Sequence, residues 1–210
     1  MQTSCNMKEV EYDLGQGIHM SAEPNRKLFN VHEYHRMVEV GILRERERVE
    51  LIEGEIVQMT AIGHRHWVRV ARLTSLFIET FGKKVVTSIQ GPARLSEWSE
   101  PEPDVTVFKP RADFYAGKQP GPEDILFVVE VADSSLSYDN RVKATLYAKA
   151  GIQEYWIEDL ISDTMLVYRH PVDGQYTTVL ALNRQDSISP LAFPDISFQV
   201  DNLLGAVVTE

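Results

Sequence analysis

Two acidic residues of this sequence stand where an ionised side chain is costly. Glu130 interrupts the run 125–131, which is otherwise apolar, and Asp104 follows Pro103 at the start of a second β-type run. Burying an ionised carboxylate destabilises the folded chain unless a cation or hydrogen-bond donors compensate it. Each residue is therefore interpreted either as a ligand of a bound group or as part of a cap or a structural ion pair.

Two carboxylates of this kind suit a hard divalent cation. Oxygen ligands that face an open cavity bind Mg²⁺ or Mn²⁺, which keeps several water molecules and can accept further oxygens from a substrate phosphate. Cys5 is the sole cysteine, so neither an intrachain disulfide nor a cysteine-based zinc site is possible. A magnesium or manganese site on Asp104 and Glu130 is the metal chemistry that these residue types favour.

Lys143 is a third candidate, because a lysine beside a metal can stabilise or orient a hydroxide nucleophile. Asp139, Lys143 and Tyr147 follow one another at intervals of four residues, so a helix presents them on one face. An ordinary surface ion pair between Asp139 and Lys143 is the alternative interpretation.

Two histidines and two glutamates are further candidates. His64 and His66 begin a predicted helix, but residues two apart on a helix point in different directions, so we do not expect both to bind one metal. A helix-end or core position is the competing interpretation for a histidine here. Glu50 and Glu55 belong to a predicted hairpin, and of the two we favour Glu55 as a neighbour of the site.

A basic stripe follows the same predicted helix. Arg65, Arg69 and Arg72 recur at intervals of three and four residues, which places them on one helical face. Such a stripe can contact phosphate groups, although a solvated face is its more frequent meaning. Both interpretations stay open at the level of the sequence.

The periodicity of the apolar residues predicts the elements that position these side chains. The run 125–131 is apolar on both faces apart from Glu130, so we expect it at the centre of a sheet. Gly54 and Gly174 supply the turns of two predicted hairpins. The expected helices are 31–43, 64–81 and 139–150, and the expected strands are 49–52, 55–59, 84–90, 104–108, 125–131, 154–158, 164–170 and 175–182.

Composition limits the class of protein. The chain has 210 residues, of which 43% are hydrophobic, and this suits one domain, expected at 29–210, behind a flexible arm at 1–28. Its formal net charge of −10 argues against a protein that holds nucleic acid through a global positive field. No apolar run approaches the roughly 20 residues that span a bilayer, and the polar stretch 1–30 lacks the short apolar core that is typical of a signal peptide. A soluble, cytoplasmic protein without membrane contact is expected.

An ordered set of segments resembles the PD-(D/E)XK nuclease superfamily, and within it the bacterial "putative restriction endonuclease" family. A Pro-Asp pair opens one strand, and a glutamate lies within the next hydrophobic strand. The segments that carry the resemblance, over about residues 30–200, are Glu50-Leu-Ile-Glu-Gly-Glu55, His64, Pro103-Asp-Val, Val128-Val-Glu-Val131, Lys143-x-x-x-Tyr147 and Gly151-Ile-Gln-Glu-Tyr-Trp156.

The resemblance implies a mixed α/β fold of the restriction-endonuclease-like type. In this fold a central mixed sheet is flanked by helices, and here an antiparallel strand region is added at the C-terminal side. The implied activity is metal-dependent hydrolysis of phosphodiester bonds by a DNA endonuclease. The implied partners are DNA, which we expect to be weakly bound because the chain is acidic, and a second copy of the chain in a homodimer.

The resemblance also implies roles for single residues. Asp104 and Glu130 are the implied catalytic metal ligands, and the carbonyl of Val131 completes the metal's ligand shell. Ala132 stands where the motif has its lysine, so Lys143 is the implied relocated catalytic lysine. The residues that border the site are expected to be Glu55, His64 and Tyr147.

Two other hypotheses remain open. In the first, the chain is a catalytically inactive module of the same fold that binds nucleic acid or protein. In the second, the carboxylates belong to a buried network of structural ion pairs. A metal titration separates the last hypothesis from a cation site, because a ligand that binds the folded state stabilises it.

Overall fold

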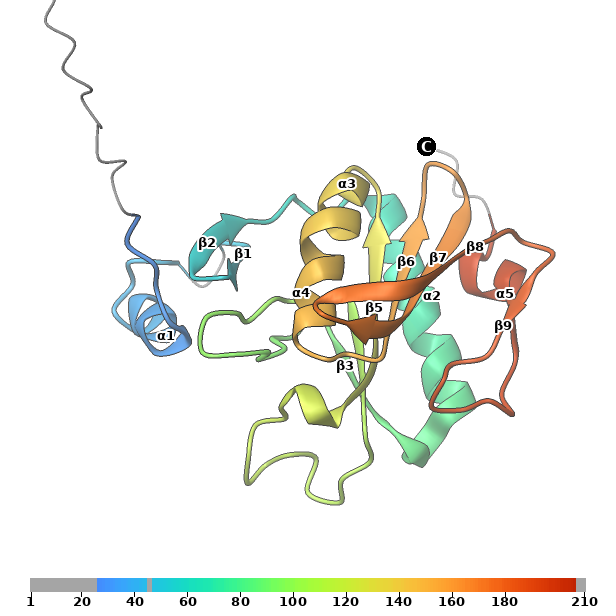
Figure 1. Ribbon diagram of the computed structural model, residues 1–210, viewed down its shortest axis with the longest axis horizontal. Helices are drawn as coiled ribbons and strands as arrows, with labels where there is room; N and C mark the ends of the chain where they lie inside the picture. The colour runs from blue at the N-terminus through green and yellow to red at the C-terminus, as the bar shows by residue number, and fades with distance from the viewer. Residues whose placement is uncertain (1–25, 45–46, 207–210) are drawn as a thin grey trace, which may run out of the picture.

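The computed structural model describes residues 26–44 and 47–206 (Figure 1). Most of the expected arm, 1–28, lies outside the described residues. Helices and strands are interspersed up to residue 149, and strands predominate after it. In chain order the elements are α1 (Val31–Glu39), β1 (Val49–Ile52), β2 (Glu55–Gln58), α2 (His64–Phe81), η1 (Gly82–Lys84), β3 (Val86–Ile89), β4 (Val105–Phe108), η2 (Pro122–Asp124), β5 (Ile125–Ala132), α3 (Leu136–Tyr138), η3 (Asp139–Lys143), α4 (Ala144–Lys149), β6 (Glu154–Asp159), β7 (Thr164–Val172), β8 (Gln175–Leu182), β9 (Ser187–Ile188), β10 (Phe198–Gln199) and α5 (Val200–Leu204).

Six strands form one mixed sheet in the order β3-β4-β5-β6-β7-β8. β5 and β6 are parallel, whereas the other neighbouring pairs are antiparallel. A parallel pair needs a crossover, and the helical stretch from α3 to α4 provides it. β5 therefore takes the central position that its apolar residues predicted. The mixed sheet flanked by helices, with antiparallel strands toward the C-terminal side, is confirmed.

Helices cover both faces of the sheet, and Figure 1 shows α2 and α4 on opposite sides of it. On one face Phe77 of α2 packs edge-on against Phe127 and Trp156. On the other face Tyr147 of α4 packs against Tyr155. Burial of each large apolar side chain stabilises the fold by about 1.5–3 kcal/mol. The two cores fix the strand ends that carry the polar residues.

A smaller layer beside the sheet contains α1 and the β1–β2 hairpin. The hairpin turns at Glu53 and Gly54, whose φ angles of 48° and 86° confirm the predicted turn. Leu51 exchanges backbone hydrogen bonds of 3.3 and 2.8 Å with Glu100, in the segment that leads to β4. The hairpin is thereby held next to the start of β4.

The structure differs from the predicted elements at several places. α1 ends at Glu39 instead of residue 43, and the strand expected at 84–90 covers only Val86–Ile89, after the 3-10 turn η1. The helix expected at 139–150 begins at Leu136 and takes π geometry between Asp139 and Lys143, a distortion that is frequent at functional sites. β9, β10 and α5 were not predicted, because segments of two to five residues carry too little periodicity. Among the described residues, no helix is both long and apolar enough to cross a bilayer.

Candidate active site

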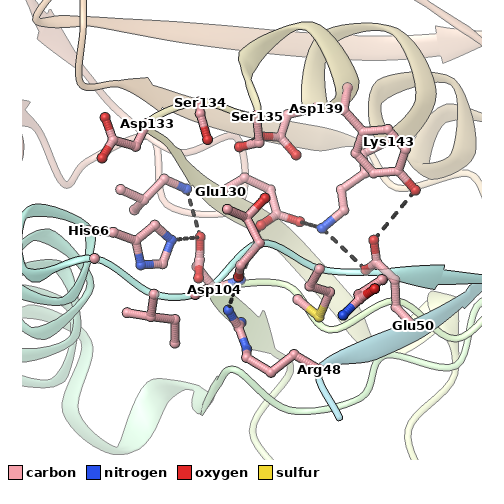
Figure 2. A pocket seen from close by; sticks show the side chains of 18 of the residues that line it. Arg48, Glu50, His66, Asp104, Glu130, Asp133, Ser134, Ser135, Asp139 and Lys143 are labelled. Atoms are coloured by element: carbon pink, nitrogen blue, oxygen red, sulfur yellow. Dashed lines mark hydrogen bonds and ion pairs between the residues drawn. The ribbon is translucent and has the colours of Figure 1, made fainter.

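Asp104 and Glu130 lie side by side on neighbouring strands. Asp104 immediately precedes β4, and Glu130 lies near the end of β5, which pairs with β4 in antiparallel register. The Asp104 amide donates to Glu130 Oε2 at 3.3 Å, and the Val131 amide donates to Asp104 Oδ2 at 2.9 Å. Each carboxylate thus binds the backbone next to the other, which brings the two together within one buried site (Figure 2).

Lys143 and Tyr147 approach Glu130 from the crossover helix. Lys143 Nζ donates to Glu130 Oε1 at 2.8 Å, and the Tyr147 hydroxyl donates to the same oxygen at 2.9 Å. Both side chains are buried. The surface pair between Asp139 and Lys143 is not formed, because both residues are buried and Asp139 accepts from the Ser135 hydroxyl at 2.5 Å.

Glu50, and not Glu55, reaches this cluster. Glu50 Oε2 lies 3.3 Å from Lys143 Nζ, whereas Glu55 is exposed and pairs with Arg26 at 2.7 Å. The preference for Glu55 was therefore wrong about position. The hairpin register places Glu50 and Glu55 on the same face, because Glu50 alternates with Ile52, which pairs with Glu55. Glu55 lies next to the turn, whereas Glu50 and its partner Val57 lie farther from the turn and line the cavity.

His66 occupies the place that was expected for His64. His66 Nε2 lies 2.9 Å from Asp104 Oδ2, whereas His64 is exposed and stacks on Trp67. The buried residues Val70 and Leu73 lie four and seven positions after His66, so His66 continues the buried stripe of α2. That spacing is the signal that identifies His66 from the sequence.

The three arginines of α2 differ in burial. Arg69 is buried, with Nε 3.4 Å from Glu158 Oε1, and the Arg72 Nε donates to the carbonyl of Asn202 at 2.9 Å. Arg65 donates to the carbonyl of Leu160 at 2.9 Å. Burial therefore removes Arg69 from any contact with phosphate. Arg65 is half-buried and Arg72 is exposed, so a phosphate contact by these two residues stays a prediction.

The surroundings shift the pKa values of the two carboxyl groups in opposite directions. Burial raises the pKa of Glu130 to about 8, although the Lys143 ammonium opposes this shift. Burial also acts on Asp104, but hydrogen bonds and charge from His66, with the Val131 amide, lower the pKa of Asp104 overall. Burial lowers the pKa of Lys143, but the charges of Glu130 and Glu50 outweigh it and raise that pKa. Asp104 is thus the more stable anion, whereas Glu130 favours its protonated form unless a further cation lies beside it.

A cavity of about 360 Å³ opens onto these groups. Its wall includes both carboxylates, Val131, His66 and Lys143. In Figure 2 His66 lies on the Asp104 side of the cluster, and Lys143 lies on the side toward Glu50. The cavity therefore gives water and small ligands a route to the paired carboxylates.

The donor set fits a hard cation that keeps several waters. Within residues 26–44 and 47–206, no group of three or more His, Cys, Asp or Glu side chains is arranged to hold a metal ion, so a cation here would depend on two carboxylates and on water. Among the same residues Asp104 Oδ1 and Glu130 Oε2 each accept one hydrogen bond, of 3.1 and 3.3 Å, which leaves each oxygen a second lone pair. Mg²⁺ is typically bound through one or two carboxylates, with waters in the remaining positions.

Comparison with known proteins places this site in context. The sequence model of the Uma2 family, described as "Putative restriction endonuclease", matches residues 31–201. A crystal structure of a putative nuclease belonging to DUF820 from Anabaena variabilis has the same fold, with a TM-score of 0.65 and 18% sequence identity. The alignment covers 84% of this chain and 97% of that one. Among curated proteins, none matches the chain.

Proposed function

Because the chain belongs to the Uma2 family of restriction-endonuclease-like proteins, we propose that it is a metal-dependent DNA endonuclease that hydrolyses phosphodiester bonds. The observation that carries the proposal is the pairing of Asp104 with Glu130 in a cavity where Lys143 contacts Glu130 at 2.8 Å. Carboxylates from two strands and one lysine are the groups that the superfamily motif requires. Here the lysine comes from the crossover helix instead of the strand.

Asp104 and Glu130 are the residues that would hold Mg²⁺ or Mn²⁺, with the Val131 carbonyl as a third oxygen ligand. A divalent ion bound there would polarise the phosphate and make a nearby water more acidic. The raised pKa of Glu130 supports this assignment, since a second cation beside it compensates for the burial of its charge.

The remaining residues of the site position these groups and stabilise charge. Lys143 holds its ammonium beside Glu130, where it stabilises negative charge that develops on the attacking water. Tyr147 binds the same oxygen of Glu130 and fixes the orientation of that carboxylate. His66 does the same for Asp104. We propose that Glu50 keeps Lys143 protonated and directed into the site.

DNA is the proposed substrate, and we expect duplex binding without metal to be weak. The net charge of −10 repels phosphate, and Arg69 of α2 is buried against Glu158. A bound divalent ion offsets part of this repulsion at the site itself. We also propose a homodimer, because two sites related by a two-fold axis suit the two strands of duplex DNA.

Cleavage of supercoiled plasmid in millimolar Mg²⁺ or Mn²⁺ tests the proposed activity. The wild-type protein is expected to produce nicked or linear DNA, and Asp104→Asn is expected to produce neither, because the neutral amide is a poorer metal ligand. Gel electrophoresis over a time course measures both. A chelator should abolish the wild-type reaction.

Glu55→Gln is the matched control, because Glu55 is an exposed carboxylate that lies outside the cavity. It should cleave at the wild-type rate. Equal cleavage by the wild type and Asp104→Asn would assign the activity to a contaminant. Failure of the wild type to cleave any DNA tested would favour a binding module of the same fold.

A further inference from the structure

β8 forms a long, uncharged edge of the six-stranded sheet. It runs for eight residues, Gln175–Leu182, and pairs with β7 on one side. Its sequence, QYTTVLAL, contains no charged residue, no glycine and no proline. The opposite edge strand, β3, has four residues. β8 thus lacks the short length, the charged side chains and the prolines that usually protect sheet edges.

The outer side of β8 is open in the described part of the chain. No backbone hydrogen bond there joins 175–182 to any element except β7. Alternate residues along the strand are exposed, and Val179 near its middle has 54% of its surface accessible. Figure 1 shows β8 running across the front of the molecule. Within residues 26–44 and 47–206, no backbone group therefore occupies the outer N–H and C=O groups of β8, and an added strand can pair with them.

The charge of the chain argues for a second copy as that strand. Two copies with a net charge of −10 repel each other over most surfaces, so their contact requires a region without charge. When β8 pairs with itself in antiparallel orientation, no like charges meet, because it has none. Such pairing is self-complementary about a two-fold axis, as a closed dimer requires. Its central residues Thr177, Thr178 and Val179 are β-branched and favour strands.

We propose that β8 pairs antiparallel with β8 of a second copy, so that the two six-stranded sheets join into one. This identifies the surface of the homodimer that accompanies the proposed function. The pairing itself requires neither metal nor DNA. Its test is therefore independent of whether the protein cleaves DNA.

Light scattering coupled to size-exclusion chromatography measures the mass in solution. The wild type is expected at twice the 23.9 kDa chain mass, and Val179→Lys is expected at the chain mass, because a charge at mid-strand opposes self-pairing. Val172→Lys is the matched control. Val172 is 55% exposed but lies on β7, between β6 and β8, so this variant should remain dimeric. A monomeric wild type, or a dimeric Val179→Lys, would overturn the proposal.

Disulfide trapping identifies the interface without a disruptive charge. Four variants each carry one cysteine, at 177, 178, 179 or 180, in a Cys5→Ser background. If the two-fold axis passes near the middle of the strand, one of these cysteines lies opposite the same cysteine of the second copy. At least one of these variants is expected to form a covalent dimer on mild oxidation, whereas Val172→Cys is not. A dimeric protein in which none of the four positions crosslinks would show that the copies meet elsewhere.

Discussion

Lys143→Ala is expected to slow metal-dependent cleavage by about 10² to 10⁴-fold, which corresponds to roughly 3–5 kcal/mol of barrier. The ammonium lies 2.8 Å from Glu130 Oε1 and is buried, so it acts on developing charge in surroundings where water cannot replace it. Single-turnover cleavage of a labelled duplex measures this rate. Metal affinity should fall little or rise, because a neighbouring positive charge has been removed.

Two further variants separate catalysis from folding at this position. Lys143→Arg should restore little activity, since a planar guanidinium does not reproduce a compact ammonium between two carboxylates. Lys149→Ala, on the exposed end of α4, should cleave normally. Removing one partner of a buried ion pair destabilises the fold. Cleavage rates are therefore compared only among variants that unfold in a cooperative transition. Undiminished cleavage by folded Lys143→Ala would exclude a catalytic role.

Glu130→Gln is expected to abolish cleavage and to change the pH dependence of stability. The folded-state pKa of Glu130 is raised from 4.5 to about 8, chiefly by burial. The stability contributed by the protonated group is complete below pH 4.5 and is lost as the pH rises through 8. Glutamine does not ionise, so the variant escapes this loss. Its free energy of unfolding should exceed that of the wild type at alkaline pH.

Urea denaturation at about pH 5 and about pH 9, without metal, measures this difference. The difference in the free energy of unfolding between Glu130→Gln and the wild type should be larger in the alkaline condition than in the acidic one. Glu55→Gln serves as the control, because Glu55 is exposed and its substitution should leave the pH profile unchanged. A Glu130→Gln protein that fails to fold would favour the buried structural network over a metal site.

The strands that carry the proposed ligands could be predicted because their sequence signals are local. Glu130 is the single charge in the run 125–131, and the prolines that precede Asp104 and follow Phe108 mark the ends of the second strand. The spacing of Lys143 and Tyr147 placed both on one helical face, and both contact Glu130. In each case the pattern within one helix or strand was sufficient to predict where the side chain lies.

The errors occurred where the choice depended on how elements pack. Glu50 and Glu55 lie on the same face of one hairpin, and only the docking of that hairpin decides which end of the face reaches the sheet. Arg69 was expected on a polar face, but its partner Glu158 comes from a strand far along the chain. His66 differs from these two cases. Its helical spacing from the apolar residues of α2 was visible in the sequence and places its side chain on the buried side of the helix.

Thermal unfolding as a function of Mn²⁺ and Mg²⁺ concentration tests most directly whether Asp104 and Glu130 together hold a metal. An ion that binds the folded state stabilises it by about 1.4 kcal/mol for each tenfold increase above the Kd. The wild-type Tm is therefore expected to rise linearly with the logarithm of metal concentration. The Tm of Asp104→Asn should stay constant over the same range. An identical rise in the two proteins would contradict a metal site on these carboxylates.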